Sequence, residues 1–465
     1  MANIFAFDQM LLFGVVSVLL LIGLILRAKI SFFQRFFIPA CITAGLIGLF
    51  LKGIILFFGL DISFLPEDDL KYFAYHLFNI TFISIGLTTE KKSLSSKQEK
   101  RKGLSGVLGM GLIISSVAAL QFLIGGISVL VFNILGYNLF PTFGFLVPMG
   151  FEEGPGQALS IGQTWEQYGF ANASTIGLSF AMFGFLVAIF VGVPLVGWII
   201  KKGYVKVKTM DVSKEFKTGI FERHADKESA GKLTTHSSSI DALTVHAALI
   251  GVVYLITYGF LFLLEQVSPS DLIEMYWGFF FIFGLLFAFL LRKIIEKIGV
   301  DHVLDERLQN RITGLSVDLL IVTSIIAISF AVVWQFMIPL IIMAAITAAI
   351  TLFWILYIGR RIWREDVYER ISGVFGMETG TVATGLVLIR LIDPFFKTHA
   401  AKDLALGSIV ALPFLFIMFH VMNGPILFGW SLELTLLIFA AFELLILGLF
   451  KLLKLWHSNP TIKEL

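Results

Sequence analysis

The sequence predicts an all-α polytopic membrane protein with two inverted repeats, each of five transmembrane helices plus one re-entrant hairpin, and an extra C-terminal helix. The first observation behind this prediction is composition: the 465 residues are 57% hydrophobic and 15% charged, with a mean hydropathy of +0.89. Soluble domains are far less apolar. The second observation is a series of apolar runs near the ~20 residues that cross a bilayer as a helix. The third is a pair of stretches, 147–160 and 375–384, that place carboxylates and glycine breaks inside apolar sequence.

Eleven apolar runs are expected to cross the membrane as helices. They are 9–26, 36–60, 70–89, 104–133 and 173–200 in the first half, 240–264, 275–296, 315–335, 338–358 and 403–422 in the second half, and an additional run at 431–451.

The polar segments divide these runs into predicted domains. They are a first repeat over 1–200, a cytoplasmic linker over 201–239, a second repeat over 240–422, and the extra transmembrane helix with its tail over 423–465. The linker is rich in Lys, Ser and Thr and lacks apolar periodicity, which is typical of a mobile segment.

Lys and Arg gather in alternate loops, and loops with such an excess are cytoplasmic. The basic loops at 27–35, 90–103 and 201–239 are therefore expected inside, and the acidic connections at 61–69 and 265–274 outside. The N-terminus is then outside and the C-terminus inside.

This alternation holds only if the two interrupted stretches enter and leave the membrane on the same side. A re-entrant hairpin at about 141–170 would enter from outside, and one at about 371–394 from inside. The two tips would then meet near the middle of the bilayer, and the halves would have inverted topology, as in many transporters.

Both stretches carry the groups that an ion or substrate site needs at membrane depth. A broken backbone must be shielded from lipid, and carboxylates there are candidates for ion or substrate handling. Backbone N–H groups after Gly156 and Gly380 suit an anionic group, whereas carbonyl, hydroxyl and carboxylate oxygens suit sodium. A sodium site is expected near Glu153, Glu378, Thr379 and Thr381. The full set of candidate substrate- or ion-binding residues is Glu152, Glu153, Gly154, Gly156, Gln157, Ser160, Asn172, Asp318, Glu378, Thr379, Gly380, Thr381 and Thr384.

Three roles are open for Glu152, Glu153 and Glu378. They can neutralise bound sodium, carry a coupling proton because burial disfavours the charged form, or bind a cationic group such as a substrate amine. A structural alternative is that they only face a water-filled vestibule. Glu443 is expected to make a helix–helix or dimer contact. Arg390 is expected to extend toward the inner interface, with an ion pair to Glu378 left open.

The segment from Glu166 to Leu195 resembles the bacterial sodium/glutamate symporter family. It reads Glu-Gln-Tyr-Gly-Phe-Ala-Asn-Ala-Ser-Thr-Ile, then Phe-Ala-Met-Phe-Gly-Phe, then Gly192-Val-Pro194. Further matching pieces occur in order, at Ile38-Pro39, Ile85-Gly86-Leu87, Trp334 and Pro339. At the hairpin tips the chain departs from the family pattern, because Pro155 stands where the family has His and carboxylates precede it.

The resemblance implies a symporter in which sodium influx drives uptake of an anionic amino acid, with inverted repeats, an elevator-like movement and a homodimeric assembly. We therefore expect a sodium-coupled importer of a small amino acid or organic acid, glutamate by resemblance, in the cytoplasmic membrane of a bacterium. The expected partners are the substrate, sodium or a proton and the lipid bilayer, with no nucleic acid and no cofactor besides the coupling ion. The alternatives are a proton-coupled transporter of a zwitterionic or cationic substrate and, in another class, an ion channel. An enzyme is not expected, because no nucleophile–base pair or metal-ligand set stands out.

Overall fold

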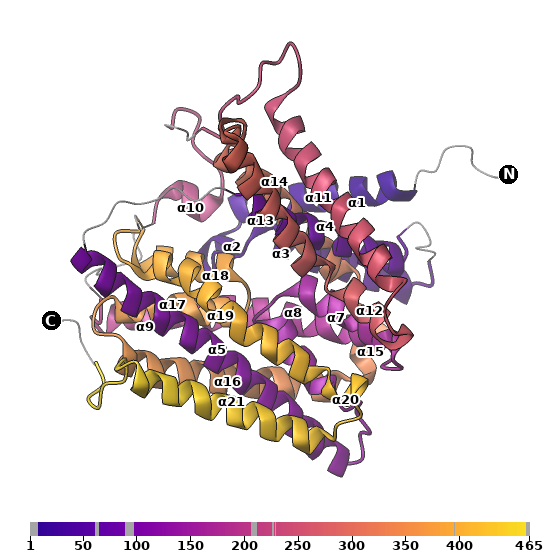
Figure 1. Ribbon diagram of the computed structural model, residues 1–465, viewed down its shortest axis with the longest axis vertical. Coiled ribbons are helices and arrows are strands. Elements are labelled where there is room, and N and C mark those ends of the chain that lie inside the picture. Colours follow the sequence, from indigo (N-terminus) through magenta and orange to yellow (C-terminus); the bar gives the residue numbers. More distant parts are fainter. Residues whose placement is uncertain are drawn as a thin grey trace.

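The computed structural model (Figure 1) describes residues 8–60, 65–88, 97–205, 212–225, 227, 229–394 and 396–461. These residues form helices joined by loops, and no strand occurs among them, so the all-helical prediction is confirmed. The N-terminal helices are α1 (Asp8–Lys29), α2 (Ser31–Arg35), α3 (Ala40–Phe57), α4 (Glu67–Leu87), α5 (Lys97–Ile134), η1 (Phe143–Phe145), α6 (Leu146–Phe151), α7 (Pro155–Gln167), α8 (Ala173–Phe190), α9 (Gly192–Lys201) and α10 (Lys214–Thr218). The others are α11 (Ala242–Glu265), α12 (Ser270–Gly278), α13 (Phe280–Ile298), η2 (Asp301–Val303), α14 (Glu306–Ile326), α15 (Phe330–Gln335), α16 (Met337–Ile362), α17 (Val367–Glu378), α18 (Val382–Ile392), α19 (Ala400–Met422), α20 (Gly424–Leu427) and α21 (Leu432–Leu452).

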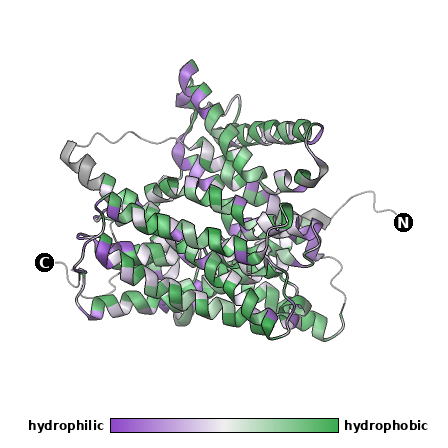
Figure 2. Ribbon diagram, turned by 60° about the horizontal axis from the view of Figure 1, so that its bottom comes forward, coloured by the Kyte–Doolittle hydropathy of each residue, from purple (hydrophilic) through white to green (hydrophobic). Residues whose placement is uncertain are grey.

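Eight helices in the described ranges are long and apolar enough to cross a membrane, or nine if the bent pair α12–α13 forms one span. Eleven were predicted. The helices α4 and α14 are as long as a span, with 21 residues each, but they carry charged and polar side chains and fall outside the eight. Apolar residues cover most of the helical surface, and polar ones gather at helix ends and in loops (Figure 2). Residues 61–64 and 89–96, which belong to two of the predicted loops, lie outside the described residues.

The helix predicted at 315–335 is wrong at both its start and its continuity. The helix α14 begins nine residues earlier, because the Asp305 side chain caps it by accepting a hydrogen bond from the backbone N–H of Leu308 at 3.0 Å. It then ends at Ile326, and α15 begins only at Phe330. The Lys52 ammonium lies at this break and donates to the carbonyl oxygens of Ile326 and Ile328, at 3.1 and 3.2 Å. These bonds satisfy backbone groups that an interrupted helix leaves without partners.

Two other predicted spans are also interrupted. The run at 275–296 is bent by 57° between α12 and α13. The run at 173–200 is divided at Val191 into α8 and α9, and Pro194 lies in the first turn of α9. Proline cannot donate to the helical hydrogen-bond ladder, which explains a break just before it.

The helices pack in two groups with the short helices between them (Figure 1). In one group α5 packs against α16, α19 and α21. In the other, α4 packs against α13 and α14, while α3 packs on α14, α1 on α3 and α11 on α13. The helix α7 contacts α4, α12 and α14 of the second group, whereas α17 contacts α5, α16 and α19 of the first. The helices α7 and α17 are therefore each packed against three other helices.

One helix of the predicted linker, α10, contacts the membrane helices. An Arg27 guanidinium nitrogen of α1 donates to the carbonyl oxygen of Phe216 in α10 at 3.0 Å. The Phe216 ring lies 5.5 Å from that of Phe37.

Candidate functional site

The first interrupted stretch forms a helical break between α6 and α7. Glu152, Glu153 and Gly154 connect these two helices. Gly154 has φ +83° and ψ −175°, a backbone region that is essentially restricted to glycine. Pro155 then starts α7 at a position where its missing N–H costs nothing. All six residues of α6 are buried, as are the first eight of α7.

The second interrupted stretch forms a similar break between α17 and α18. All twelve residues of α17 are buried. Thr381 caps α18 through two hydrogen bonds with Thr384. The Thr381 side chain accepts from the Thr384 backbone, and the Thr381 backbone N–H donates to the Thr384 hydroxyl at 2.8 Å. Thr379 and Gly380 complete the connection.

The two breaks meet, as the sequence predicted. A Cβ atom built on Gly154 would lie 3.2 Å from the Thr381 methyl carbon and 3.6 Å from the Gly380 carbonyl oxygen. A Cβ on Gly184 of α8 would lie 2.8 Å from the Thr379 carbonyl oxygen. Residues more than 200 positions apart in the chain are thus in contact at the tips.

Replacing Gly154 by alanine should destabilise the protein by about 1–3 kcal/mol, because the added Cβ forces a backbone region that other residues avoid. It should also push the second tip away. The melting temperature of the purified protein measures the first effect. Gly251→Ala in α11 is the matched control, because a Cβ there meets no atom within 4 Å; equal melting temperatures for the two variants would contradict the prediction.

Three carboxylates gather at the meeting point. Glu152 is 4% exposed, Glu378 is fully buried, and Glu153 is half-buried. Glu152 and Glu378 interact electrostatically with each other, and both interact with Glu153. One carboxylate oxygen of Glu152 and both of Glu378 are buried without a hydrogen-bond partner in the described structure. Buried polar atoms normally have partners, so these oxygens mark the place where a cation or donor is needed.

Three hydroxyl groups at or near the tips are already engaged as donors. Thr379 donates to the Phe375 carbonyl oxygen at 2.7 Å, and Ser160 donates to the Gly278 carbonyl oxygen at 2.5 Å. The Thr384 hydroxyl lies 2.6 Å from the Gly376 carbonyl oxygen. These residues were predicted as ligands, and with their protons committed they can offer only oxygen lone pairs.

Gly156 and Gln157 have different roles in the first turn of α7. A Cβ on Gly156 would lie 2.0 Å from the Phe78 ring of α4, so this glycine permits close packing. Gln157 is 4% exposed, lies beside Glu153, and its amide oxygen has no partner. Gln157 therefore lies at the meeting point of the two breaks, whereas Gly156 packs against α4.

Asn172 and Asp318 are not at the tips. Asn172 is exposed at the start of α8, and α7 extends for about 18 Å between the first tip and that region. Its positive φ of 63° explains the residue type, because asparagine tolerates left-handed backbone. The candidate residues of the sequence analysis therefore do not form a single cluster.

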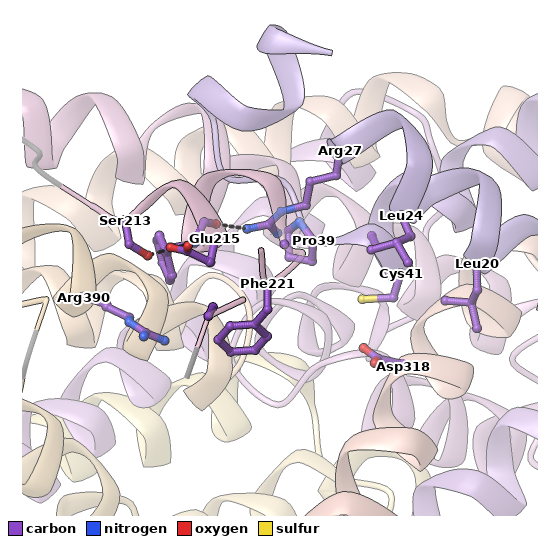
Figure 3. A pocket seen from close by; sticks show the side chains of 14 residues that line it. Leu20, Leu24, Arg27, Pro39, Cys41, Ser213, Glu215, Phe221, Asp318 and Arg390 are labelled. Carbon is purple, nitrogen blue, oxygen red and sulfur yellow. Dashed lines mark hydrogen bonds between the residues drawn. The ribbon is translucent and has the colours of Figure 1, made fainter. Parts of the chain in front are cut away.

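Asp318 instead lines a cavity of about 520 Å³ beneath the linker. Figure 3 shows its carboxylate facing Cys41, while Arg27 and Arg390 occupy other parts of the lining. Arg390 is exposed and lies 4.8 Å from the centroid of the Phe216 ring, so no ion pair with Glu378 forms.

Sequence reasoning missed one residue at the meeting point. The Gln121 side chain of α5 is fully buried and donates to the Glu378 carbonyl oxygen at 3.0 Å and to the Thr351 hydroxyl at 3.2 Å. It fixes the end of α17 against α5 and α16. A signal was present, because a lone glutamine in a long apolar run needs partners.

Glu443 makes the predicted helix–helix contact. The Ser116 hydroxyl of α5 donates to its carboxylate at 2.6 Å, and Trp354 of α16 donates to Ser116 at 2.9 Å. The extra helix is thereby joined to two neighbouring helices. Glu443 is not among the residues that contact the tips.

The described residues contain no group of three or more His, Cys, Asp or Glu side chains that could hold a metal ion. Oxygen ligands for sodium would therefore come from pairs of carboxylates together with hydroxyl, amide and backbone oxygens. In comparisons with known proteins, residues 5–393 match the family described as sodium/glutamate symporter. No curated protein matches the chain.

Proposed function

Because the chain belongs to the sodium/glutamate symporter family, we propose that this multi-pass membrane protein is a sodium-coupled symporter that imports a small amino acid or organic acid. The observation that carries the proposal is the meeting of two helical breaks at buried, unpartnered carboxylates. Paired interrupted segments from two halves of a chain are typical of transporter binding sites. The family suggests glutamate as the substrate.

The packing of the helices supports two inverted repeats. If α1, α3, α4, α5 and α8 are exchanged for α11, α13, α14, α16 and α19, the observed contacts map onto one another. The α3–α14 contact becomes α13–α4, α1–α3 becomes α11–α13, and α5–α19 becomes α16–α8. The pairs α4–α14 and α5–α16 map onto themselves. We therefore assign α6–α7 and α17–α18 as the two re-entrant hairpins.

The contact between α7 and α4 supports a sliding movement for alternating access. On the scaffold side lie the rings of Phe78 and Phe82 of α4 and of Phe281 of α13, in edge-on and tilted arrangements with centroids 4.9–5.0 Å apart. Apolar surfaces of this kind have no directional bonds to break when they shift, so the bond from Ser160 of α7 to the Gly278 carbonyl oxygen of α12 would have to break in such a movement. We assign the hairpins, with α5, α8, α16 and α19, to the moving part and the group around α4 to the scaffold.

The tips supply suitable groups for both the coupling ion and the substrate. Glu153 and Glu378 with the hydroxyl oxygens of Thr379 and Thr381 form the proposed sodium site. The first-turn N–H groups of α7, which have no partners within the helix, suit a substrate carboxylate. A homodimer in a bacterial cytoplasmic membrane, with the N-terminus outside, completes the proposal.

Uptake into proteoliposomes tests the function. With sodium and proton gradients imposed separately, an inward sodium gradient should drive accumulation of at least one labelled amino acid or organic acid, and an ionophore should abolish it. Accumulation driven only by a proton gradient would replace sodium by a proton as the coupling ion. Flux that does not saturate would indicate a channel, and no driven uptake of any compound would refute coupled transport.

A further inference from the structure

Several buried side-chain oxygens at the tips have no hydrogen-bond partner in the described structure. We call Gln121, Glu152, Gln157 and Glu378 the acceptor cluster. Each is buried, and each has at least one side-chain oxygen without a hydrogen-bond partner in the described structure. Five such oxygens occur among these four residues. An acceptor of this kind is satisfied only by a donor or a cation.

Three neighbouring hydroxyl groups do not supply these donors. The hydroxyl protons of Ser160, Thr379 and Thr384 point to backbone carbonyl oxygens. No ion pair among the described residues joins an Arg or Lys to Glu152 or Glu378. Arg370, on the second hairpin, is already bonded to Asp403.

The tips offer a place for one carboxylate. Backbone N–H groups of Gly156 and Gln157, in the first turn of α7, lack partners within the helix, since the first helical bond of this region runs from Ala158 to Gly154. A helix N-terminus of this kind attracts one anionic group. The described side chains present no second set of donors, such as an arginine fork, for another carboxylate.

From this balance we propose that the site selects an amino acid with an uncharged or basic side chain and rejects acidic amino acids. The inference rests on the proposed function, because it names the substrate class of the same site. The substrate ammonium fills the acceptor cluster, and its α-carboxylate binds the N-terminus of α7. A side-chain carboxylate would bring a further anionic group beside the carboxyl groups of Glu152, Glu153 and Glu378, which no Arg or Lys among the described residues neutralises through an ion pair.

Ligand-induced thermal stabilisation of the purified protein, in sodium-containing buffer, tests this charge preference. The probes are L-glutamine, L-glutamate, L-ornithine and glutarate. Glutamine and glutamate have nearly the same shape and differ in charge, while glutarate lacks the amine. We expect apparent affinity for glutamine or ornithine to exceed that for glutamate by at least about tenfold, since one like-charge contact is sufficient for such a ratio. Glutarate should give no shift.

The variant Glu152→Gln tests whether the acceptor cluster causes this charge preference. It removes one charge from the acceptor cluster, so the ratio of glutamine to glutamate affinity should fall by about tenfold. Glu443→Gln is the matched control, because its carboxylate is bonded to Ser116 in another part of the membrane region; its ratio should equal that of the wild type. The melting temperature without ligand shows that each variant is folded.

The outcomes separate this inference from the proposed function. Tighter binding and sodium-driven accumulation of glutamate would overturn the inference and leave the symporter intact. The expected charge order without any gradient-driven uptake would support the site and refute coupled transport. The inference is also overturned if none of the four probes stabilises the protein, or if Glu152→Gln leaves the ratio unchanged.

Discussion

Replacing Glu378 by glutamine is expected to abolish sodium-driven accumulation of substrate. The side chain is fully buried at the end of α17, and neither carboxylate oxygen has a partner in the described structure. A coupling cation near this charge gains about 4 kcal/mol at a separation of about 4 Å and an effective dielectric constant near 20. Loss of that interaction corresponds to a fall of at least about 100-fold in the apparent affinity for the ion. Initial uptake rates at several sodium concentrations measure it.

The matched control is Glu443→Gln in α21, the same change at another buried carboxylate. Its partner Ser116 donates at 2.6 Å, so the variant should lose only about 1 kcal/mol of stability and keep sodium coupling. Substrate counterflow without a gradient shows whether Glu378→Gln still binds and exchanges substrate. Wild-type coupling in Glu378→Gln would remove this residue from the ion site, and an equal loss in both variants would make the effect nonspecific.

The contact between the two interrupted stretches was predictable, because their residues are unsuited to an ordinary membrane helix. Glu152, Glu378 and the glycine breaks are costly in apolar sequence, so the amino-acid pattern alone distinguishes them from ordinary spanning residues. The structure confirms that the stretches around Gly154 and Thr381 meet. The same physical cost that marks these residues also explains their burial inside the protein.

The partner of each polar side chain was not predictable from local sequence. Thr379 and Ser160 have the oxygen atoms of ion ligands, yet their protons go to Phe375 and Gly278, and only the folded chain determines this. Asp318 has the same chemistry as the tip carboxylates but lies in the cavity under the linker. A residue type states what a group can do, whereas its location depends on tertiary packing.

The predicted helix boundaries failed where long-range contacts stabilise an interruption. The run at 315–335 is apolar throughout its second half, so periodicity gives no reason for it to stop at Ile326. The end of α14 at Ile326 depends on Lys52, more than 270 residues away. The Lys52 ammonium binds the carbonyl oxygens that the interrupted helix leaves free. Lys52 itself is a visible signal, because a lysine inside an apolar run requires a partner.

Replacing Arg370 by methionine is expected to cost about 3–5 kcal/mol of stability, because it leaves the buried Asp403 carboxylate without its partner. The guanidinium donates to one Asp403 oxygen from two nitrogens, at 2.9 and 2.7 Å, and side-chain exposures are 8% and 1%. Arg370 also donates to the Glu365 carbonyl oxygen. The pair ties α17, which carries Glu378, to the first turn of α19. Thermal unfolding of the purified protein measures the loss.

Lys214→Met provides the matched control, since it removes a cation from the exposed pair Lys214–Glu222 and should leave the melting temperature unchanged. The double variant Arg370→Met with Asp403→Leu separates two explanations of the Arg370 effect. If the cost comes from an uncompensated buried charge, removing that charge should recover much of the lost stability. If the double variant remains as unstable as Arg370→Met, the geometry of the salt bridge itself positions α17, and sodium coupling through Glu378 should then fail in both variants.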